Sequence, residues 1–380
     1  MLYFDYAATT PVDLRVQARI SHALAESFGN PSANYKLGKA SKNKLTTARR
    51  RLKALLKLDE ASDLYFTSGA TEAINWALRS QAYRARDLGL GHHIVTTAIE
   101  HSAVDRVLLD LENKGFEVTR LQPNSNQQFS LEQFIEASKQ TTIGWTVMAV
   151  NNEVGSILPI KELGQYAKQK GYWFHVDATQ AIGYQMINPQ DFPCTSFNGS
   201  GHKFYAPKGI GFLVYQAWNK EMILDPLLLG GDQEYTKRSG TENLPYILGM
   251  VEALELMDQG YHELQESFVE LSTYFFQQLN QTGIEYQRNG DLVHHNNRIH
   301  SIWLKEKLAS QVIIQLDMQD IYLSAGSACS AGSIKPSRVL TAYYPKNEAR
   351  WRESVRISFG RYTTKNEIDQ LIEAITKIYQ

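Results

Sequence analysis

The chain has 380 residues, of which 43% are hydrophobic and 21% charged, and its formal net charge is −1. The length favours two or three domains around a sizeable core. The near-zero charge gives no electrostatic case for nucleic acid or an anionic membrane as the main ligand, so we expect function to come from a site. No apolar run approaches the roughly 20 residues of a membrane span.

The N-terminus lacks the basic and apolar regions of a signal peptide. Two cysteines, Cys194 and Cys329, are too few for a disulfide framework in a chain of this length. We therefore expect a reducing, cytoplasmic setting with both thiols free. Cys194 is interpreted as a buried structural thiol, whereas Cys329 stands among Ser, Ala and Gly alone.

Short apolar segments alternate with helical patterns along the first two thirds of the chain. We predict helices from about Thr71, near 103–113 and at 161–171, and strands at 64–67, 93–98, 146–150, 172–177 and 209–215. This alternation favours an α/β fold with a mainly parallel sheet covered by helices. In such sheets, ligands bind at the carboxyl ends of the strands.

The pattern changes after about Gly240. A long helix is predicted from Leu248 to about Gln281, and an amphipathic helix capped by Thr363 and Thr364 ends the chain. We predict a large domain at 15–255 and a smaller α+β domain formed by 1–14 and 256–380.

The stretch TSGATEA, residues 67–73, follows a predicted strand and opens a helix. Gly69 permits a tight turn, and the free N–H groups of a first helical turn attract an anion. An ordinary helix cap is the alternative. The stretch lacks the lysine of a nucleotide-binding loop, which argues against a triphosphate.

Asp177 stands at the end of an apolar strand, where a partly desolvated carboxylate requires a cationic partner. It is either the N-cap of a helix or a fixed anion for a positively charged ring nitrogen. Gln180 follows three residues later and is expected near the same ligand.

Lys203 lies in a Gly/Ser-rich turn between Ser200, His202 and a following strand. A lysine whose amine pKa is lowered there can form a Schiff base with a carbonyl. An isolated lysine would be interpreted as a solvated loop residue. His101 and Asn152 also follow predicted strands, where capping or turn chemistry is the alternative.

Together these features favour a pyridoxal phosphate site, because that cofactor needs a phosphate cradle, a carboxylate for its ring nitrogen and a lysine for its aldehyde. At this point the chain resembles the cysteine desulfurases of the class V aminotransferase group, pyridoxal-phosphate enzymes of fold type I. The resemblance runs over essentially the whole chain. It is carried by the segments YFDYAATTP, GNPSA, FTSGATEAIN, EHSAV, VNNEVGSILPI, FHVDATQAIG, SGHKFYAPKGIGFLVY, RSGTEN, GSACSAG and VRISFGRYTT.

The resemblance implies roles for individual residues. Lys203 would bind the cofactor covalently, His101 would stack on its ring and assist proton transfer, and Cys329 would be the nucleophile. Asp177 would pair with the ring nitrogen and Gln180 with the ring hydroxyl. The phosphate would be held by Ala70, Thr71, Ser200 and His202, and by Thr241 of the second subunit of a homodimer.

Asn152 and Arg356 would bind the substrate carboxylate, with Asn152 also near the cofactor. A planar guanidinium suits that role, since it binds a carboxylate through two parallel hydrogen bonds. Without the resemblance, Arg356 would pass as a surface arginine on a strand. No metal site is expected.

The resemblance implies conversion of L-cysteine to L-alanine with a persulfide on Cys329. The sulfur then passes to an acceptor protein, a scaffold for iron–sulfur assembly or a tRNA-thiolation enzyme. The alternatives are a selenocysteine lyase or another enzyme of the group, and a non-enzymatic regulatory protein on the same fold. Tyr35 and Asp232 stand where the family often has histidine and glycine, which puts the loop shape near Thr241 in doubt.

Overall fold

The computed structural model describes residues 1–185, 188–326 and 336–380. Its central sheet has the strand order β2-β8-β7-β6-β5-β3-β4. Neighbouring strands pair in parallel except at β8, which is antiparallel to both β2 and β7. The strands are β2 (Asp63–Thr67), β3 (His93–Thr97), β4 (Glu117–Leu121), β5 (Thr142–Met148), β6 (Trp173–Asp177), β7 (Ser196–Ser200) and β8 (Gly211–Tyr215). The predicted α/β fold with a mainly parallel sheet is confirmed.

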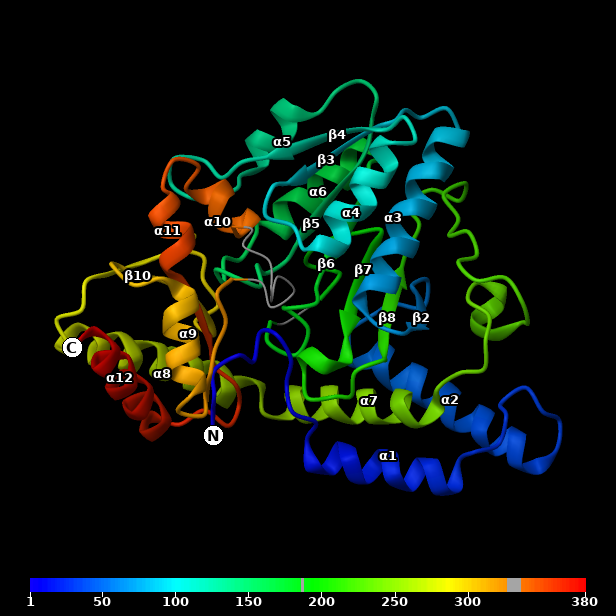
Figure 1. Ribbon diagram of the computed structural model, residues 1–380. Coiled ribbons are helices and arrows are strands. Elements are labelled where there is room, and N and C mark those ends of the chain that lie inside the picture. The colour runs from blue at the N-terminus through cyan, green and yellow to red at the C-terminus, as the bar shows by residue number, and fades with distance from the viewer. Residues whose placement is uncertain (186–187, 327–335) are drawn as a thin grey trace.

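Helices cover both faces of this sheet (Figure 1). Successive side chains of a strand point to opposite faces. Accordingly, Ile94 of β3 belongs to the core formed with α3 (Ala70–Asp87) and α4 (Ser102–Glu112). The next residue, Val95, belongs to the other core, which includes side chains of α6 (Ile160–Lys170). The sheet is therefore buried on both sides, as its apolar strands predict.

A second group of elements lies beside the large sheet (Figure 1). Its three-stranded antiparallel sheet has β10 (Ile299–Leu304) between β12 (Ser354–Ser358) and β9 (Tyr286–Arg288). The short strand β1 (Leu2–Tyr3) pairs in parallel with β11 (Ile321–Tyr322), so the N-terminus joins this group. Helices of this group are α8 (Tyr261–Gln281), α9 (Ala309–Asp317), α10 (Arg338–Tyr343), α11 (Glu348–Glu353) and α12 (Lys365–Tyr379), whereas α5 (Leu131–Ala137) contacts β4 and α6.

The predicted cap of the last helix is confirmed: Thr364 and Glu367 form a reciprocal capping box at the start of α12. In the described parts of the chain, no helix is both long and apolar enough to cross a membrane. The domain boundaries at 14/15 and 255/256 stay a prediction.

The predicted single helix from Leu248 to Gln281 is wrong. The chain forms α7 (Leu244–Gln259) and α8, which are separated at Gly260 with φ −103° and ψ 20°. Glycine is a poor helix former, so a helix breaks readily there. Gly249 stays inside α7 for a packing reason: a Cβ at that position would lie 2.6 Å from the Ile20 side chain of α1 (Leu14–Glu26).

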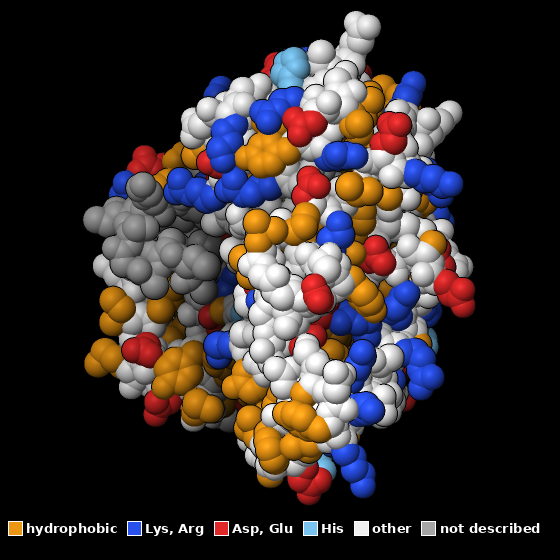
Figure 2. Space-filling view, turned by 90° about the vertical axis from the view of Figure 1, so that its right-hand side faces the viewer, with side chains coloured by type: hydrophobic (Ala, Val, Ile, Leu, Met, Phe, Trp, Pro, Cys, Tyr) orange, Lys and Arg blue, Asp and Glu red, His pale blue; other side chains and the backbone are white. Residues whose placement is uncertain are grey.

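The face at the right of Figure 1 carries charges of both signs, interspersed, with hydrophobic side chains gathered low on it (Figure 2). Large apolar side chains are exposed in two segments. Phe28, in the segment before α2 (Lys36–Leu55), is 73% exposed, and Leu229 and Tyr235, in the segment after β8, are 88% and 66% exposed. Exposed apolar side chains of this size are typical of interaction surfaces when they cluster.

Candidate functional site

A cavity of about 430 Å³ lies at the carboxyl ends of the parallel strands. The ends of β5, β6 and β7 contribute Met148, Asp177 and Ser200 to its wall. The structure brings together these sequence-predicted residues around the cavity: Ala70, Thr71, His101, Asn152, Asp177, Gln180, Ser200, His202, Lys203 and Arg356. Thr241 does not line it, and Cys329 falls outside the described residues.

The N-terminus of α3 forms one end of the cavity. Gly69 precedes the helix with φ +156° and offers no side-chain cap. The first helical hydrogen bond runs from the Ala73 N–H to the Gly69 carbonyl, so the N–H groups of the preceding turn remain available to an anion. Ser200 lies beside this turn, since a Cβ at Gly69 would be 3.5 Å from its Oγ.

The carboxylate in the first turn of α3 does not cancel this positive end. Glu72 is paired with Arg238, whose Nε lies 2.8 Å from Glu72 Oε1. The other oxygen, Oε2, accepts a hydrogen bond from the Ser68 N–H at 2.8 Å. A helix N-terminus with its carboxylate so engaged is a suitable anion site.

Asp177 is 5% exposed and is held through one oxygen. Its Oδ1 accepts hydrogen bonds from Thr179 N (3.1 Å), Thr179 Oγ1 (2.5 Å) and Asn198 Nδ2 (3.0 Å). No donor among the described residues reaches Oδ2, which stays available to a cation in the cavity. The alternative of a helix N-cap is wrong, because turns and no helix follow Asp177.

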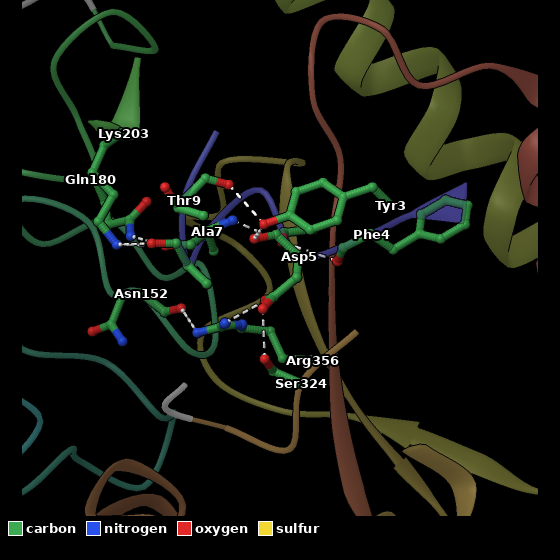
Figure 3. Close-up of polar contacts among 12 residues, drawn as sticks. Tyr3, Phe4, Asp5, Ala7, Thr9, Asn152, Gln180, Lys203, Ser324 and Arg356 are labelled. Atoms are coloured by element: carbon green, nitrogen blue, oxygen red, sulfur yellow. Dashed lines mark hydrogen bonds and ion pairs between the residues drawn. The ribbon is translucent and has the colours of Figure 1, made fainter. Parts of the chain in front are cut away.

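Ala7 and Ala8, from an N-terminal segment at residues 5–10, form another part of the cavity wall, and Figure 3 shows the contacts of this segment. The carbonyls of Ala7 and Ala8 each accept a hydrogen bond from Lys203 Nζ at 2.8 Å. Gln180 Nε2 donates to the same Ala7 carbonyl at 2.8 Å, and Gln180 Oε1 accepts from Arg298 Nη2 at 2.6 Å. Lys203 and Gln180 are thus positioned by backbone carbonyls near the N-terminus of the chain.

His101 caps α4, because its Nδ1 accepts a hydrogen bond from the Ala103 N–H at 3.1 Å. A ring nitrogen that accepts carries no proton, so the proton of the neutral ring is on Nε2. Burial lowers the pKa of His101. The Asp177 charge raises this pKa, whereas the Lys203 and Arg338 charges lower it further. The sequence-predicted alternative of a capping residue is therefore confirmed, while the ring still lines the cavity.

His202 is joined to the N-terminal segment through Nδ1 and Thr9 Oγ1, 3.1 Å apart. Burial, together with the Lys203 and Lys208 charges, lowers the pKa of His202 to about 4. An ordinary histidine has a pKa of about 6.5. At a pH between these values, the His202 ring binds a proton in the unfolded chain but not in the folded chain. Protonation therefore favours the unfolded chain, and the folded chain loses stability as the pH falls from 6.5 toward 4.

We expect the His202→Gln variant, freed of cofactor, to lose less stability than the wild type when the pH falls from 7 to 5. From the two pKa values, the wild type is expected to lose up to about 2 kcal/mol more of its free energy of unfolding than the variant. Unfolding midpoints measured at both pH values check it. His22→Gln is the control, because it makes the same substitution at a water-exposed ring on α1. Parallel curves for His202→Gln and the wild type would contradict the assignment.

Arg356 on β12 is 1% exposed at the cavity wall. Its Nη1 donates to the Asn152 carbonyl at 3.0 Å, and its Nη2 pairs with Asp5 Oδ1 at 2.6 Å. Its Nε finds no hydrogen-bond partner within the described parts of the chain. Nη1 and Nη2 each use one of their two N–H groups in these bonds, so Arg356 keeps further N–H groups that a carboxylate can use.

Thr241 lies in a second cavity of about 230 Å³, whose wall includes Ser68 and Gly209 as the first cavity does. The segment before Thr241 is held by a buried ion pair between Arg49 and Glu234, with Nη2 and Oε1 2.6 Å apart. Asp232 starts a short turn in which Glu234, Tyr235 and Thr236 all have positive φ. The sequence left the loop shape near Thr241 in doubt, and the structure gives the segment after Asp232 this turn.

Sequence reasoning assigned no role to the N-terminal segment. Ala7, Ala8 and Thr9 bond to predicted site residues 173 to 196 positions away, and Asp5 bonds to Arg356, 351 positions away. The available signal was the motif YFDYAATTP, in which Asp5 and two threonines interrupt a short apolar stretch next to a proline.

A lysine, a buried carboxylate and an uncapped helix N-terminus meet at one sheet edge, which are the groups that the predicted pyridoxal phosphate site requires. The comparisons point to the same class of enzyme. Residues 2–371 match the family described as aminotransferase class-V, and the chain belongs to this family. Within it, a cysteine desulfurase IscS of Methanosarcina thermophila is 36% identical over 379 residues, which cover 100% of this chain and 92% of that protein. The chain thus falls in the cysteine desulfurase group, as its motifs predict.

Two solved structures extend the comparison. A NifS-like protein is 30% identical with a TM-score of 0.90, and the match covers 100% of this chain and 99% of that chain. A structure described as SspA in complex with cysteine is 32% identical with a TM-score of 0.82, over 96% of this chain and 100% of that chain. The predicted fold type is confirmed.

Proposed function

We propose that this chain is a pyridoxal-phosphate-dependent cysteine desulfurase that converts L-cysteine to L-alanine and takes up the sulfur on Cys329. One observation carries the proposal: a lysine, a buried carboxylate with an open oxygen and an uncapped helix N-terminus line one cavity. The volume of about 430 Å³ lies within the usual range for cofactor sites.

The residues present fit this cofactor. The phosphate would bind at the N-terminus of α3 with Thr71, Ser200 and His202, and Ala70 would contribute its backbone. Asp177 Oδ2 would hold the proton of the ring nitrogen, and Gln180 would face the ring hydroxyl. His101 would lie against the ring with its neutral imidazole. When bound, the cofactor supplies an aldehyde for amino groups and an electron-withdrawing ring.

The protein groups have distinct tasks in the reaction. Arg356 and Asn152 hold the substrate carboxylate, and the Lys203 amine takes the proton from the α-carbon. The Cys329 thiolate attacks the sulfur of L-cysteine. The new S–S bond forms as the substrate C–S bond breaks. The three-carbon fragment, with protons restored, leaves as L-alanine, and a persulfide stays on Cys329.

The purified enzyme, loaded with pyridoxal phosphate, is expected to form alanine from L-cysteine with equimolar sulfide in the presence of a reductant. Parallel assays with L-selenocysteine separate this function from that of a selenocysteine lyase, which would release selenide and leave L-cysteine unchanged. A protein that fails to bind the cofactor, judged by its visible absorbance, would instead support the regulatory alternative.

We further propose that the enzyme is a homodimer in a reducing cytoplasm and hands its sulfur to an acceptor protein, a scaffold or a tRNA-thiolation enzyme. The exposed Phe28, Leu229 and Tyr235 side chains support a subunit interface. Thr241 would there reach the phosphate bound by the partner subunit.

A further inference from the structure

We propose that Asp5 is a positioning residue that holds Arg356 in place for the α-carboxylate of the substrate. The inference rests on the proposed function and adds a residue to it. Asp5 lies just after β1, and Arg356 lies on β12, 351 positions later in the chain. Figure 3 shows their side chains in contact, and Arg356 lines the cavity.

The contact is close and largely shielded from water. Arg356 Nη2 lies 2.6 Å from Asp5 Oδ1, and the side chains are 1% and 15% exposed. A nearly buried guanidinium needs a carboxylate partner, because an uncompensated charge in that environment is costly. Among the described residues, Asp5 is the carboxylate that forms an ion pair with Arg356.

Asp5 also fixes the direction of the guanidinium. Its second oxygen, Oδ2, accepts a hydrogen bond from Ser324 Oγ at 2.8 Å. Ser324 and Arg356 exchange backbone hydrogen bonds, so Asp5 bonds to both members of one strand pair. A carboxylate held at both oxygens cannot follow a moving arginine. The Nη2 end of Arg356 is therefore immobilised.

The remaining contacts leave room for a ligand. Nη1 is held by the Asn152 carbonyl at 3.0 Å, and Nε has no partner within the described parts of the chain. A purely structural ion pair would satisfy the buried arginine more completely. Here the bonds to Asn152 and Asp5 use one N–H of each terminal nitrogen, and Arg356 lines the cavity, which suits the temporary binding of a second carboxylate.

This arrangement predicts selectivity for amino acids over plain amines. An α-amino acid presents its carboxylate to the oriented guanidinium, whereas an amine without a carboxylate gains nothing from it. Loss of Asp5 lets Arg356 move, and misplacement by about 1 Å of a positioning group can cost up to about a hundredfold. The effect of Asp5 should therefore depend on the carboxylate of the ligand.

The test measures equilibrium binding of L-alanine and ethylamine to the holoenzyme through the absorbance of its cofactor. Asp5→Ala is expected to weaken L-alanine at least about tenfold and to change ethylamine by less than about twofold. Asp5→Asn keeps an oxygen acceptor and is expected to weaken L-alanine by about threefold, which serves if the alanine variant does not fold. Equal changes for both ligands, or none, would overturn the inference.

Two further variants isolate the cause. Asp13→Ala removes another buried carboxylate paired with an arginine, Arg361, outside the cavity. It is expected to lower the melting temperature and leave the L-alanine to ethylamine affinity ratio unchanged. Arg356→Lys tests the proposed function itself. Selective loss of L-alanine in Arg356→Lys but not in Asp5→Ala refutes only the role of Asp5, whereas no loss in Arg356→Lys refutes the carboxylate site.

Discussion

The Lys203→Ala variant is expected to lose at least about a thousandfold in kcat/KM for L-cysteine, because it removes both the anchoring amine and the proposed base. The protein should still fold, since Lys203 contacts the N-terminal segment through its side-chain amine and the Ala7 and Ala8 carbonyls can bind water. Steady-state alanine formation measures the loss.

A readout without turnover accompanies this prediction. Borohydride reduction of the wild-type holoenzyme should attach the cofactor irreversibly to the peptide that contains Lys203, and the same treatment of Lys203→Ala should attach none. Lys208 is the competing amine, because it also lines the cavity. A cofactor attached to Lys208 in the wild type would show that the wrong lysine has been assigned.

The Cys329→Ala variant is expected to form no persulfide and to lose L-cysteine desulfuration to the background level, while its cofactor absorbance stays at the wild-type intensity. The reason is that the thiolate accepts the sulfur but has no part in the cofactor cradle described above. Alanine and sulfide assays measure the first effect, and the visible spectrum measures the second.

Cys194→Ser is the matched control for the other cysteine. Cys194 is 5% exposed, and burial raises the pKa of its thiol far above the ordinary value. A buried thiol of this kind is a poor nucleophile, so the variant should retain desulfuration. Desulfuration that survives in Cys329→Ala but disappears in Cys194→Ser would reverse the assignment.

Much of the large sheet could be predicted from local patterns, because strands such as β2, β3 and β5 are largely buried and each precedes a helix. β7 was missed, since Ser196–Ser200 is polar and glycine-containing although all five residues are buried. The break at Gly260 was also missed, because a glycine in a helical pattern is read equally well as tolerated or as a boundary.

The site residues also fall into those that the sequence predicts and those that it does not. Asp177 was predictable because it ends an apolar strand and the carboxyl ends of parallel strands meet at one edge. Lys203 was predictable from its Gly/Ser-rich turn and from the resemblance. The contribution of Asp5 was not, since it depends on the pairing of β1 with β11 and on the register that brings Arg356 beside Ser324. Such long-range pairing is encoded by the whole core and leaves no local pattern in the sequence.

The most direct test of the account is mass spectrometry of the holoenzyme after brief exposure to L-cysteine without a reductant. We expect an increase of about 32 Da, one sulfur atom, on the peptide that contains Cys329, reversed by a thiol reductant. Cys194 should stay unmodified. An adduct found on Cys194 alone, or alanine formed without any adduct on Cys329, would contradict the account.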